Sequence, residues 1–302
     1  MAGPSTAADS MDWFSLSLIC ALALATADAL TKRLFADTGA AELLVVRFAV
    51  PGALLLPLAL HNGLPPVPAA FWGWLGVLVP LELAAMAVYV TAIRDAPLHL
   101  TLPYLAFTPV FNVLTGYLVL GEEVSAAGFS GILLVTLGAY LLNLEHLGER
   151  GARLWLAPLA AVLRERGSRL MLAVAGIYSL TSVGGKAAME YTTPWVFGPF
   201  YYGVIGATLA AGLLAGRPRT LAVVARRPLQ AVAVGGLMAV MVVTHFLAVA
   251  RVEVAYMVSV KRTSLLFGIV YGALLFGERG LARNLGAGLL MVAGVAVILI
   301  AG

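Results

Sequence analysis

Charged residues are scarce in this sequence. Asp, Glu, Lys and Arg make up 11% of the 302 residues, whereas 61% are hydrophobic, and the mean hydropathy is +0.97. A soluble domain carries about 25% charged residues, so this chain has too little polar surface to face water on every side. The composition therefore excludes an ordinary soluble domain and indicates a chain whose apolar surface faces lipid.

Cysteine is almost absent, since Cys20 is the single one. It excludes an intrachain disulfide, and no Cys/His cluster of the metal-binding kind accompanies it. We therefore expect no metal and no cofactor. The sequence also lacks a Gly-rich ATP-binding loop, so any transport is expected to run on a gradient or on exchange. The basic balance, +4 in net charge, does not predict a nucleic-acid partner, because basic residues of membrane proteins concentrate in cytoplasmic loops.

The first 12 residues contain neither Lys nor Arg. A cleavable signal peptide begins with a basic region, so we expect residues 1–12 to be a short tail and the first apolar run to be a permanent span.

Long apolar runs dominate the rest of the chain. About 20 apolar residues suffice to cross a bilayer, and breaks at Pro, Gly and charge clusters separate ten such runs. The connections between most of them are very short, which makes consecutive helices antiparallel neighbours. The ten expected spans are 13–36, 40–60, 69–93, 97–120, 126–144, 169–190, 194–215, 229–249, 254–276 and 281–301.

The chain also repeats itself. The segment 117–142 resembles the segment 272–300, and Gly121 and Gly277 are 156 residues apart, as are Gly138 and Gly294. A charged connection, 145–168, separates a first repeat from a second; a short helix on the membrane surface or a partly ordered linker would both fit it. The expected domains are thus the tail 1–12, a five-helix repeat 13–144, the connection 145–168 and a second repeat 169–302.

Five spans per repeat is an odd number, so the second repeat enters the membrane upside down relative to the first. Inverted repeats are typical of carriers that alternate access around a site near the middle of the membrane. We therefore predict an all-α polytopic membrane protein of ten helices in two inverted five-helix repeats. The glycines of the fifth and tenth spans, among them Gly131 and Gly294, suit close helix contact within the chain or a dimer face.

Two short motifs carry a resemblance. Leu120-Gly121-Glu122 and Phe276-Gly277-Glu278, each followed by a Gly-spaced apolar helix, resemble the EamA-type drug/metabolite transporter superfamily over nearly the whole chain. The resemblance implies a cavity surrounded by spans one to four and six to nine. It also implies an exporter or exchanger of amino acids, sugar phosphates, nucleotide sugars or drugs, and not an enzyme.

A narrower resemblance concerns the ninth span. The segment from Tyr256 to Gly268 is similar to the ninth helix of phosphate translocators of the same superfamily, where a Lys-Arg pair holds the phosphate. The resemblance implies that Lys261 and Arg262 bind an anionic group here. Both lie in mid-span with no acidic residue within one helical turn.

Other ionisable residues fall within spans, where each costs about 2.5–3.5 kcal/mol on insertion scales. Asp28 with Lys32, and Lys186 with Glu190, lie four residues apart on one helix face and would neutralise each other; alternatively, Lys32 and Lys186 line the two ends of the transport route. Arg47 is expected to pair with Glu82 across two helices; alternatively, Glu82 couples transport to protons. Tyr89 and Tyr256 are further candidates for the pocket.

The complete set of candidate substrate-binding residues is Lys261, Arg262, Lys32, Lys186, Arg47, Glu82, Tyr89 and Tyr256. Tyr178, Tyr201, Tyr202 and His245 also fall in spans, but such residues are more often packing or interface residues. Deep cations outnumber deep acids, which favours a carboxylate or phosphate over a quaternary ammonium ligand.

We therefore predict a secondary active transporter of a small anionic or zwitterionic metabolite, of the amino acid or organic phosphate type, with amino acid export as one form. The alternatives are a multidrug or organic-cation efflux carrier of the same superfamily and, from another class, an intramembrane enzyme or a channel. The expected partners are a small-molecule substrate and the lipid bilayer. The expected location is the bacterial inner membrane, as a monomer or a homodimer. Nearly all Lys and Arg of the connections fall on one side, which favours a position of both termini outside the cytoplasm. The resemblance instead implies cytoplasmic termini, so either the chain is inverted relative to ten-span members of the superfamily or one half has a different number of spans.

Overall fold

The computed structural model describes residues 7–95, 102–145, 166–277 and 285–301, and in these ranges every regular element is a helix. The predicted connection 145–168 lies largely outside these ranges, and so do residues 1–6 of the predicted tail and Glu278. In chain order the elements are α1 (Ala7–Leu34), α2 (Ala40–Leu44), η1 (Val45–Ala49), α3 (Val50–Asn62), α4 (Ala69–Asp95), η2 (Leu102–Phe107), α6 (Thr108–Leu120), α7 (Ala126–Glu145), α9 (Arg166–Met189), α10 (Pro194–Gly216), η3 (Pro218–Leu221), α11 (Ala222–Arg226), α12 (Pro228–Val249), α13 (Val254–Lys261), α14 (Ser264–Phe276) and α15 (Leu285–Ala301).

Eight helical segments of the described chain are long and apolar enough to cross a membrane. They correspond to the first four predicted spans and to the sixth through ninth. The fifth and tenth predicted spans are present as shorter apolar helices, Ala126–Leu142 and Leu285–Ala301. The all-helical membrane fold is thus confirmed, whereas the full count of ten spans stays a prediction.

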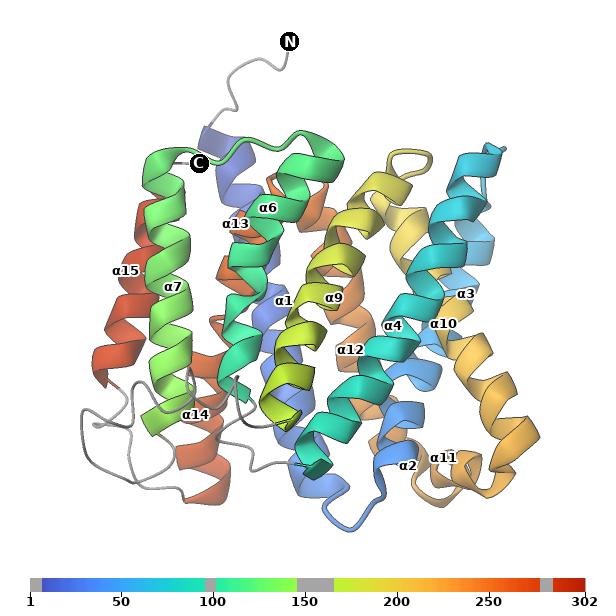
Figure 1. Ribbon diagram of the computed structural model, residues 1–302. Coiled ribbons are helices and arrows are strands. Elements are labelled where there is room, and N and C mark those ends of the chain that lie inside the picture. Colours follow the sequence, from blue (N-terminus) through green and yellow to red (C-terminus); the bar gives the residue numbers. More distant parts are fainter. Residues whose placement is uncertain (1–6, 96–101, 146–165, 278–284, 302) are drawn as a thin grey trace.

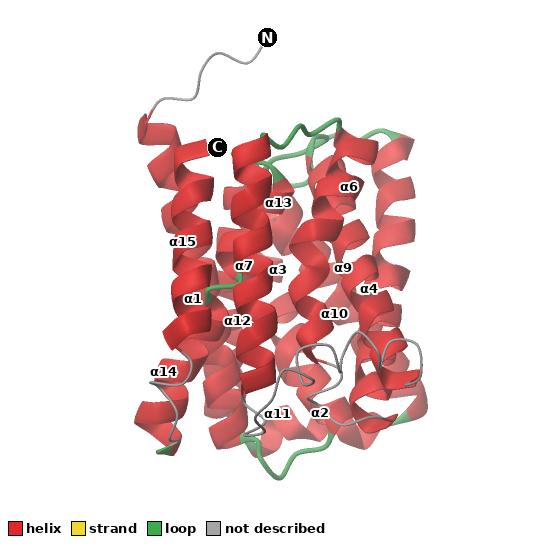
Figure 2. Cartoon of the chain, turned by 60° about the vertical axis from the view of Figure 1, so that its left-hand side comes forward, coloured by secondary structure: helices red, strands yellow, loops and turns green. Residues whose placement is uncertain are grey.

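The helices stand side by side as an upright bundle, with the start of α1 and the end of α15 on the same side (Figures 1 and 2). The most extensive helix pairs are α7–α15, α1–α12, α4–α9 and α3–α10. Each pair joins a helix that precedes residue 145 to one that follows residue 166. The two halves of the sequence therefore interdigitate, and the main hydrophobic core contains side chains of both.

The α7–α15 pair depends on glycine. A Cβ atom on Gly131 would lie 2.8 Å from the carbonyl oxygen of Gly294, and one on Gly294 would lie 2.6 Å from that of Gly131. Such distances are too short for a carbon beside an oxygen, so both positions require glycine. Small residues let helix backbones approach closely in lipid, and here they do so within one chain, as predicted from the sequence.

Three helical segments of the bundle are irregular. The segment η1 is a π-helix and η2 is a 3₁₀-helix, and the helix between Val254 and Phe276 is interrupted at residues 262–263. Such irregularities often mark functional sites. Non-helical backbone at membrane depth is tolerated where it is buried in protein or lines a water-filled cavity. A cavity close to these three segments is therefore a candidate functional site.

The helices α6 and α14 are built alike. Both contain 13 residues, and each ends on a glycine in the left-handed conformation, with φ of 67° at Gly121 and 64° at Gly277. Glycine adopts this conformation without the steric cost that a Cβ would bring. Their first residues, last residues and terminal glycines are each 156 residues apart, so the repeat seen in the sequence has a counterpart in the backbone.

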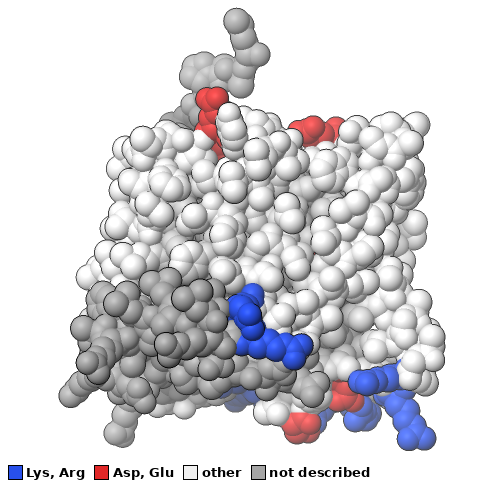
Figure 3. Space-filling model, viewed as in Figure 1, with Lys and Arg blue, Asp and Glu red and all other residues white. Residues whose placement is uncertain are grey.

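Charged side chains lie toward the two ends of the bundle in the face shown in Figure 3, with Lys and Arg toward the lower end. The helix ends at this level include those of α1, with Lys32 and Arg33, and of α11, with Arg226. The uncharged band between the ends is what a hydrocarbon layer requires.

Candidate functional site

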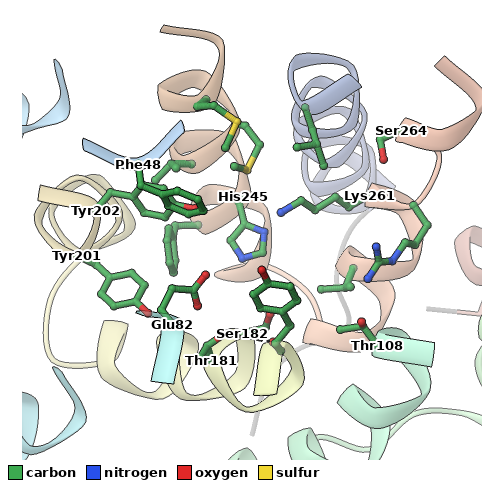
Figure 4. Close-up of a pocket in the computed structure, with 18 residues that line it drawn as sticks. Phe48, Glu82, Thr108, Thr181, Ser182, Tyr201, Tyr202, His245, Lys261 and Ser264 are labelled. Carbon is green, nitrogen blue, oxygen red and sulfur yellow. Dashed lines mark hydrogen bonds between the residues drawn. The ribbon is translucent and has the colours of Figure 1, made fainter. Parts of the chain in front are cut away.

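A cavity of about 240 Å³ lies among the helices and takes lining residues from both halves of the chain. The first half contributes α1, η1, α4 and α6, and the second contributes α9, α10, α12 and the α13–α14 segment. Its polar lining consists of Glu82, Thr108, Tyr178, Thr181, Ser182, Tyr201, Tyr202, His245, Lys261, Arg262 and Ser264 (Figure 4).

Two of the three irregular segments contribute lining residues, and the third directly precedes one. Phe48 belongs to the π-helix η1, and Thr108 begins α6 directly after the 3₁₀-helix η2. Lys261 ends α13 and Arg262 lies in the interruption before α14. The interruption relaxes the fixed angle of about 100° between consecutive helical residues, and both neighbouring cations line the same cavity.

The two cations lack an acidic partner in contact. Among the residues that the structure describes, no carboxylate lies within ion-pair distance of Lys261 or Arg262. The Nε atom of Arg262 is buried and has no hydrogen-bond partner there. A buried polar group without a partner costs free energy, so the arrangement calls for water or for a ligand that accepts hydrogen bonds.

A carboxylate lies on another wall of the cavity. Glu82, from the middle of α4, lines it beside Thr181 of α9. Figure 4 shows the Glu82 carboxylate and the Lys261 ammonium directed toward the interior, with the His245 ring between them in this view. The charge of Lys261 acts on both Glu82 and His245, yet Glu82 forms no ion pair with a described residue.

Aromatic rings form much of the remaining wall. The Phe48 and Tyr202 rings stack with their centroids 6.2 Å apart, and Phe246 packs edge-on against the ring of Tyr201. The Tyr201 hydroxyl donates to the Leu78 carbonyl at 3.4 Å. These contacts hold the aromatic side chains in place, so the wall is formed before any ligand enters.

The expected pair between Arg47 and Glu82 is wrong. Arg47, which lies in the π-helix η1, donates to Asp28 Oδ1 on α1 at 2.5 Å. The same contact takes Asp28 away from the pairing with Lys32 that the four-residue spacing suggested. Tyr89 is a neighbour of the Asp28–Arg47 pair, and neither Arg47 nor Tyr89 lines the cavity.

Lys186 is part of a contact between the two halves. Its Nζ donates to Glu122 Oε1 at 2.6 Å and to the Val252 carbonyl at 2.7 Å. The other oxygen of Glu122 accepts the backbone N–H of Val254 at 3.0 Å. The expected neutralisation by Glu190 is therefore wrong. We call Lys186, Glu122, Val252 and Val254 the upper clamp, since they lie at the upper ends of α6, α9, α12 and α13 in Figure 1.

The last two candidates also lie outside the cavity lining. The Tyr256 hydroxyl accepts the backbone N–H of Ser125 at 3.2 Å, which ties α13 to the start of α7. The ammonium of Lys32 lies 4.5 Å from the centroid of the Phe276 ring, at the lower end of the bundle. The structure thus brings three of the eight predicted residues together in the cavity: Glu82, Lys261 and Arg262.

At the lower end of the bundle, an exposed ion pair outside the membrane spans joins the two halves of the chain. The Arg227 guanidinium donates to both carboxylate oxygens of Asp37, at 2.9 and 2.6 Å. This contact lowers the pKa of Asp37 and raises that of Arg227. Arg226 pairs with Glu42 close by, so α11 and α12 are tied to the segment after α1 by two charge pairs.

Sequence reasoning missed several residues of the site. Tyr178, Tyr201, Tyr202 and His245 were set aside as ordinary packing residues, although all four line the cavity. Glu122 was seen only as part of a motif, although a carboxylate directly after a left-handed glycine at a helix end could have suggested a partner on another helix. Within the described residues no group of three or more His, Cys, Asp or Glu side chains could hold a metal ion.

Comparisons with known proteins agree with the fold of the chain. Residues 11–144 match the EamA-like transporter family. A crystal structure of another protein, 19% identical in sequence, superposes on this chain over 98% of both chains with a TM-score of 0.73. This structure is one of 27 matching chains of solved structures. No curated protein sequence matches the chain.

Proposed function

We propose that this chain, whose residues 11–144 match the EamA-like transporter family, is a secondary active transporter of a small anionic or zwitterionic metabolite. The substrate is of the amino acid or organic phosphate type, and the membrane is the bacterial inner membrane. The observation that carries the proposal is the cavity between the two halves, with Lys261 and Arg262 on its wall and no acidic partner in contact with either among the described residues.

Alternating access is proposed as the mechanism, because the helix pairs follow a two-fold pattern. In chain order, α1, α3, α4, α6 and α7 correspond to α9, α10, α12, α14 and α15. Replacing each helix by its counterpart turns the pair α1–α12 into α9–α4, and it leaves the pairs α3–α10 and α7–α15 unchanged. The contact between α6 and α9 likewise becomes that between α14 and α1. This pattern and the matched helices α6 and α14 support two inverted repeats that rock around a central site.

The ends of the route are proposed to lie near Lys186 above and Lys32 below. The upper clamp fastens α9 to the α12–α13 connection, and the Asp37–Arg227 pair fastens α1 to α12 at the opposite end. A carrier of this kind must break such contacts at one end at a time. The gathering of Lys and Arg at the lower end favours a cytoplasmic position for that end.

Organic-cation efflux is the second candidate, and one observation favours it. Glu82 lies in the cavity with the rings of Phe48, Tyr178 and Tyr202, and carboxylates with aromatic faces suit organic cations. Two cations on the same wall oppose it, because an organic cation would have to approach them without a balancing anion.

The test is counterflow in liposomes that contain the purified protein. Radiolabelled L-amino acids, hexose phosphates and tetraphenylphosphonium are each offered outside against the same unlabelled compound inside. We expect saturable, trans-stimulated uptake of an anionic or zwitterionic compound, and a loss of at least about tenfold in Lys261→Ala and Arg262→Ala, since one charged hydrogen bond accounts for such a factor.

Arg219→Ala is the matched control, because Arg219 is exposed in η3 and remote from the cavity lining. It should exchange substrate like the wild type, and thermal unfolding in detergent checks that all variants are folded. Undiminished exchange in both cavity variants would remove the anion-site assignment. Uptake of tetraphenylphosphonium alone would establish the second candidate, and uptake without trans-stimulation would indicate a channel.

A further inference from the structure

The cavity presents charges of both signs that do not touch. Lys261 and Arg262 line it from the α13–α14 segment, and Glu82 lines it from α4. None of the three forms an ion pair within the described part of the chain. The cavity, which His245 also lines, therefore has a positive wall at Lys261 and Arg262 and a negative wall at Glu82.

Elsewhere in this protein opposite charges close on each other. Asp28 holds Arg47, and Glu122 holds Lys186 at 2.6 Å. A charge away from water costs several kcal/mol unless it is paired, so packing should have joined Glu82 to Lys261 if structural stability were their role. Their separation across a cavity is better explained by a ligand that contacts both.

We propose, resting on the transport function above, that the cavity selects zwitterions: Glu82 receives the ammonium of the substrate while Lys261 and Arg262 receive its carboxylate. A phosphate ester would balance the two cations but leave Glu82 beside a dianion. An organic cation would suit Glu82 but face the two cations unbalanced. A molecule that carries a carboxylate and an ammonium satisfies both walls at once, and its orientation in the cavity is fixed by them.

The lining between the charged walls indicates what else the substrate carries. Phe48, Tyr178, Tyr202 and Phe246 contribute rings, and Met238 and Met241 contribute flexible thioethers. Thioether side chains adapt to ligands of different shape. An apolar side chain on the zwitterion would find contacts here, which makes leucine and phenylalanine suitable probes.

The experiment compares each amino acid with its two halves. Phenylalanine is set against 3-phenylpropionate, which lacks the ammonium, and 2-phenylethylamine, which lacks the carboxylate; leucine is set against 4-methylpentanoate and 3-methylbutylamine. Competition of each compound for counterflow gives its apparent affinity. In the wild type both amino acids should outcompete their halves by at least about tenfold, since each lost charge contact accounts for about that factor.

The variant Glu82→Gln distinguishes a carboxylate that binds the substrate ammonium from one that only stabilises the fold. In this variant the amino acid should fall to the level of its deaminated analogue, whereas the analogue itself keeps or gains affinity. Glu82→Asp should restore part of the preference. If Glu82→Gln lowers all ligands equally, or leaves the preference for the ammonium intact, the proposal is wrong.

Failure of this proposal is distinguishable from failure of the proposed transport function. Exchange of hexose phosphate that depends on Lys261 and survives Glu82→Gln would overturn the zwitterion assignment and leave the carrier assignment standing. An absence of exchange for every compound, with the wild type folded in the liposomes, would overturn both. Ligand-dependent rises in unfolding temperature, measured on the same variants in detergent, check the ranking without transport.

Discussion

Two Lys and Glu pairings in this protein differ in one respect. In the upper clamp Lys186 and Glu122 are 2.6 Å apart, and each also forms a hydrogen bond with the backbone, Lys186 with the Val252 carbonyl and Glu122 with the Val254 N–H. In the cavity Lys261 and Glu82 face the same space without contact. The first pairing is complete within the protein, and the second is incomplete until something fills the space.

This difference gives a criterion that distinguishes structural from ligand-binding charges in a membrane helix bundle. A charge whose partners are all supplied by the protein stabilises the arrangement of helices. A charge that reaches a cavity without a partner leaves free energy for a ligand to recover. By this criterion Lys186 belongs to the first kind, and Lys261 belongs to the second.

The largest expected effect on stability is that of Lys186→Met. The substitution removes the ammonium from Glu122, whose side chain is 10% exposed, and breaking a buried ion pair costs about 3–5 kcal/mol. Lys261→Met removes a cation with no partner in contact and should leave the free energy of unfolding unchanged or raise it. Unfolding in detergent, followed by circular dichroism, measures both.

The double variant Lys186→Met/Glu122→Gln provides the control. It removes both charges, so it should be more stable than Lys186→Met alone. The comparison fails if Lys186→Met and Lys261→Met destabilise the protein to the same extent, because the two lysines would then have equivalent surroundings.

A smaller effect is expected at the helix end that positions the clamp. Gly121 has φ of 67°, and an alanine there should cost about 1 kcal/mol, because a Cβ is unfavourable in the left-handed region. Gly212→Ala is the matched control, since that glycine is helical in α10 and a Cβ would meet nothing within 4 Å. Unfolding temperatures should fall for the first variant only, and a fall in both would mean that the conformation of Gly121 is not the cause.

The smallest effect belongs to the exposed pair Asp37–Arg227. The lowered pKa of Asp37 means that its ionised form stabilises the fold above the unfolded-state pKa of about 3.9. This stabilisation is lost as the pH falls through the lower pKa of the folded state. The wild type should therefore lose slightly more stability than Asp37→Asn between pH 6 and acid pH, and salt should reduce the difference. Identical acid titrations of unfolding would show that the pair contributes nothing.

The sequence predicted the bundle well because membrane spans are set by local composition. Each apolar run is continuous in the chain, and the short connections leave few ways to order neighbours. The repeat was visible for the same reason, since Gly121 and Gly277 follow helices of equal length.

The site was harder to predict because partners across helices depend on rotation and depth. Arg47 was paired with the wrong acid because sequence spacing does not show which of two acids on other helices it faces, and in the structure that acid is Asp28. Lys186 was considered for the transport route because its partner could not be recognised. Glu122 lies 64 residues away in sequence, and helical spacing rules identify only partners within a few residues. Lys261 and Arg262 were proposed from the resemblance of the ninth span to phosphate translocators and from their mid-span position without a nearby acid, and both line the cavity.

The most direct measurement is an experimental structure of the protein with an exchanged amino acid bound. We predict that the ligand lies in the cavity, that its carboxylate is within hydrogen-bond distance of Lys261 or Arg262, and that its ammonium faces Glu82. A ligand outside the cavity, or one bound there with the opposite orientation, would contradict it.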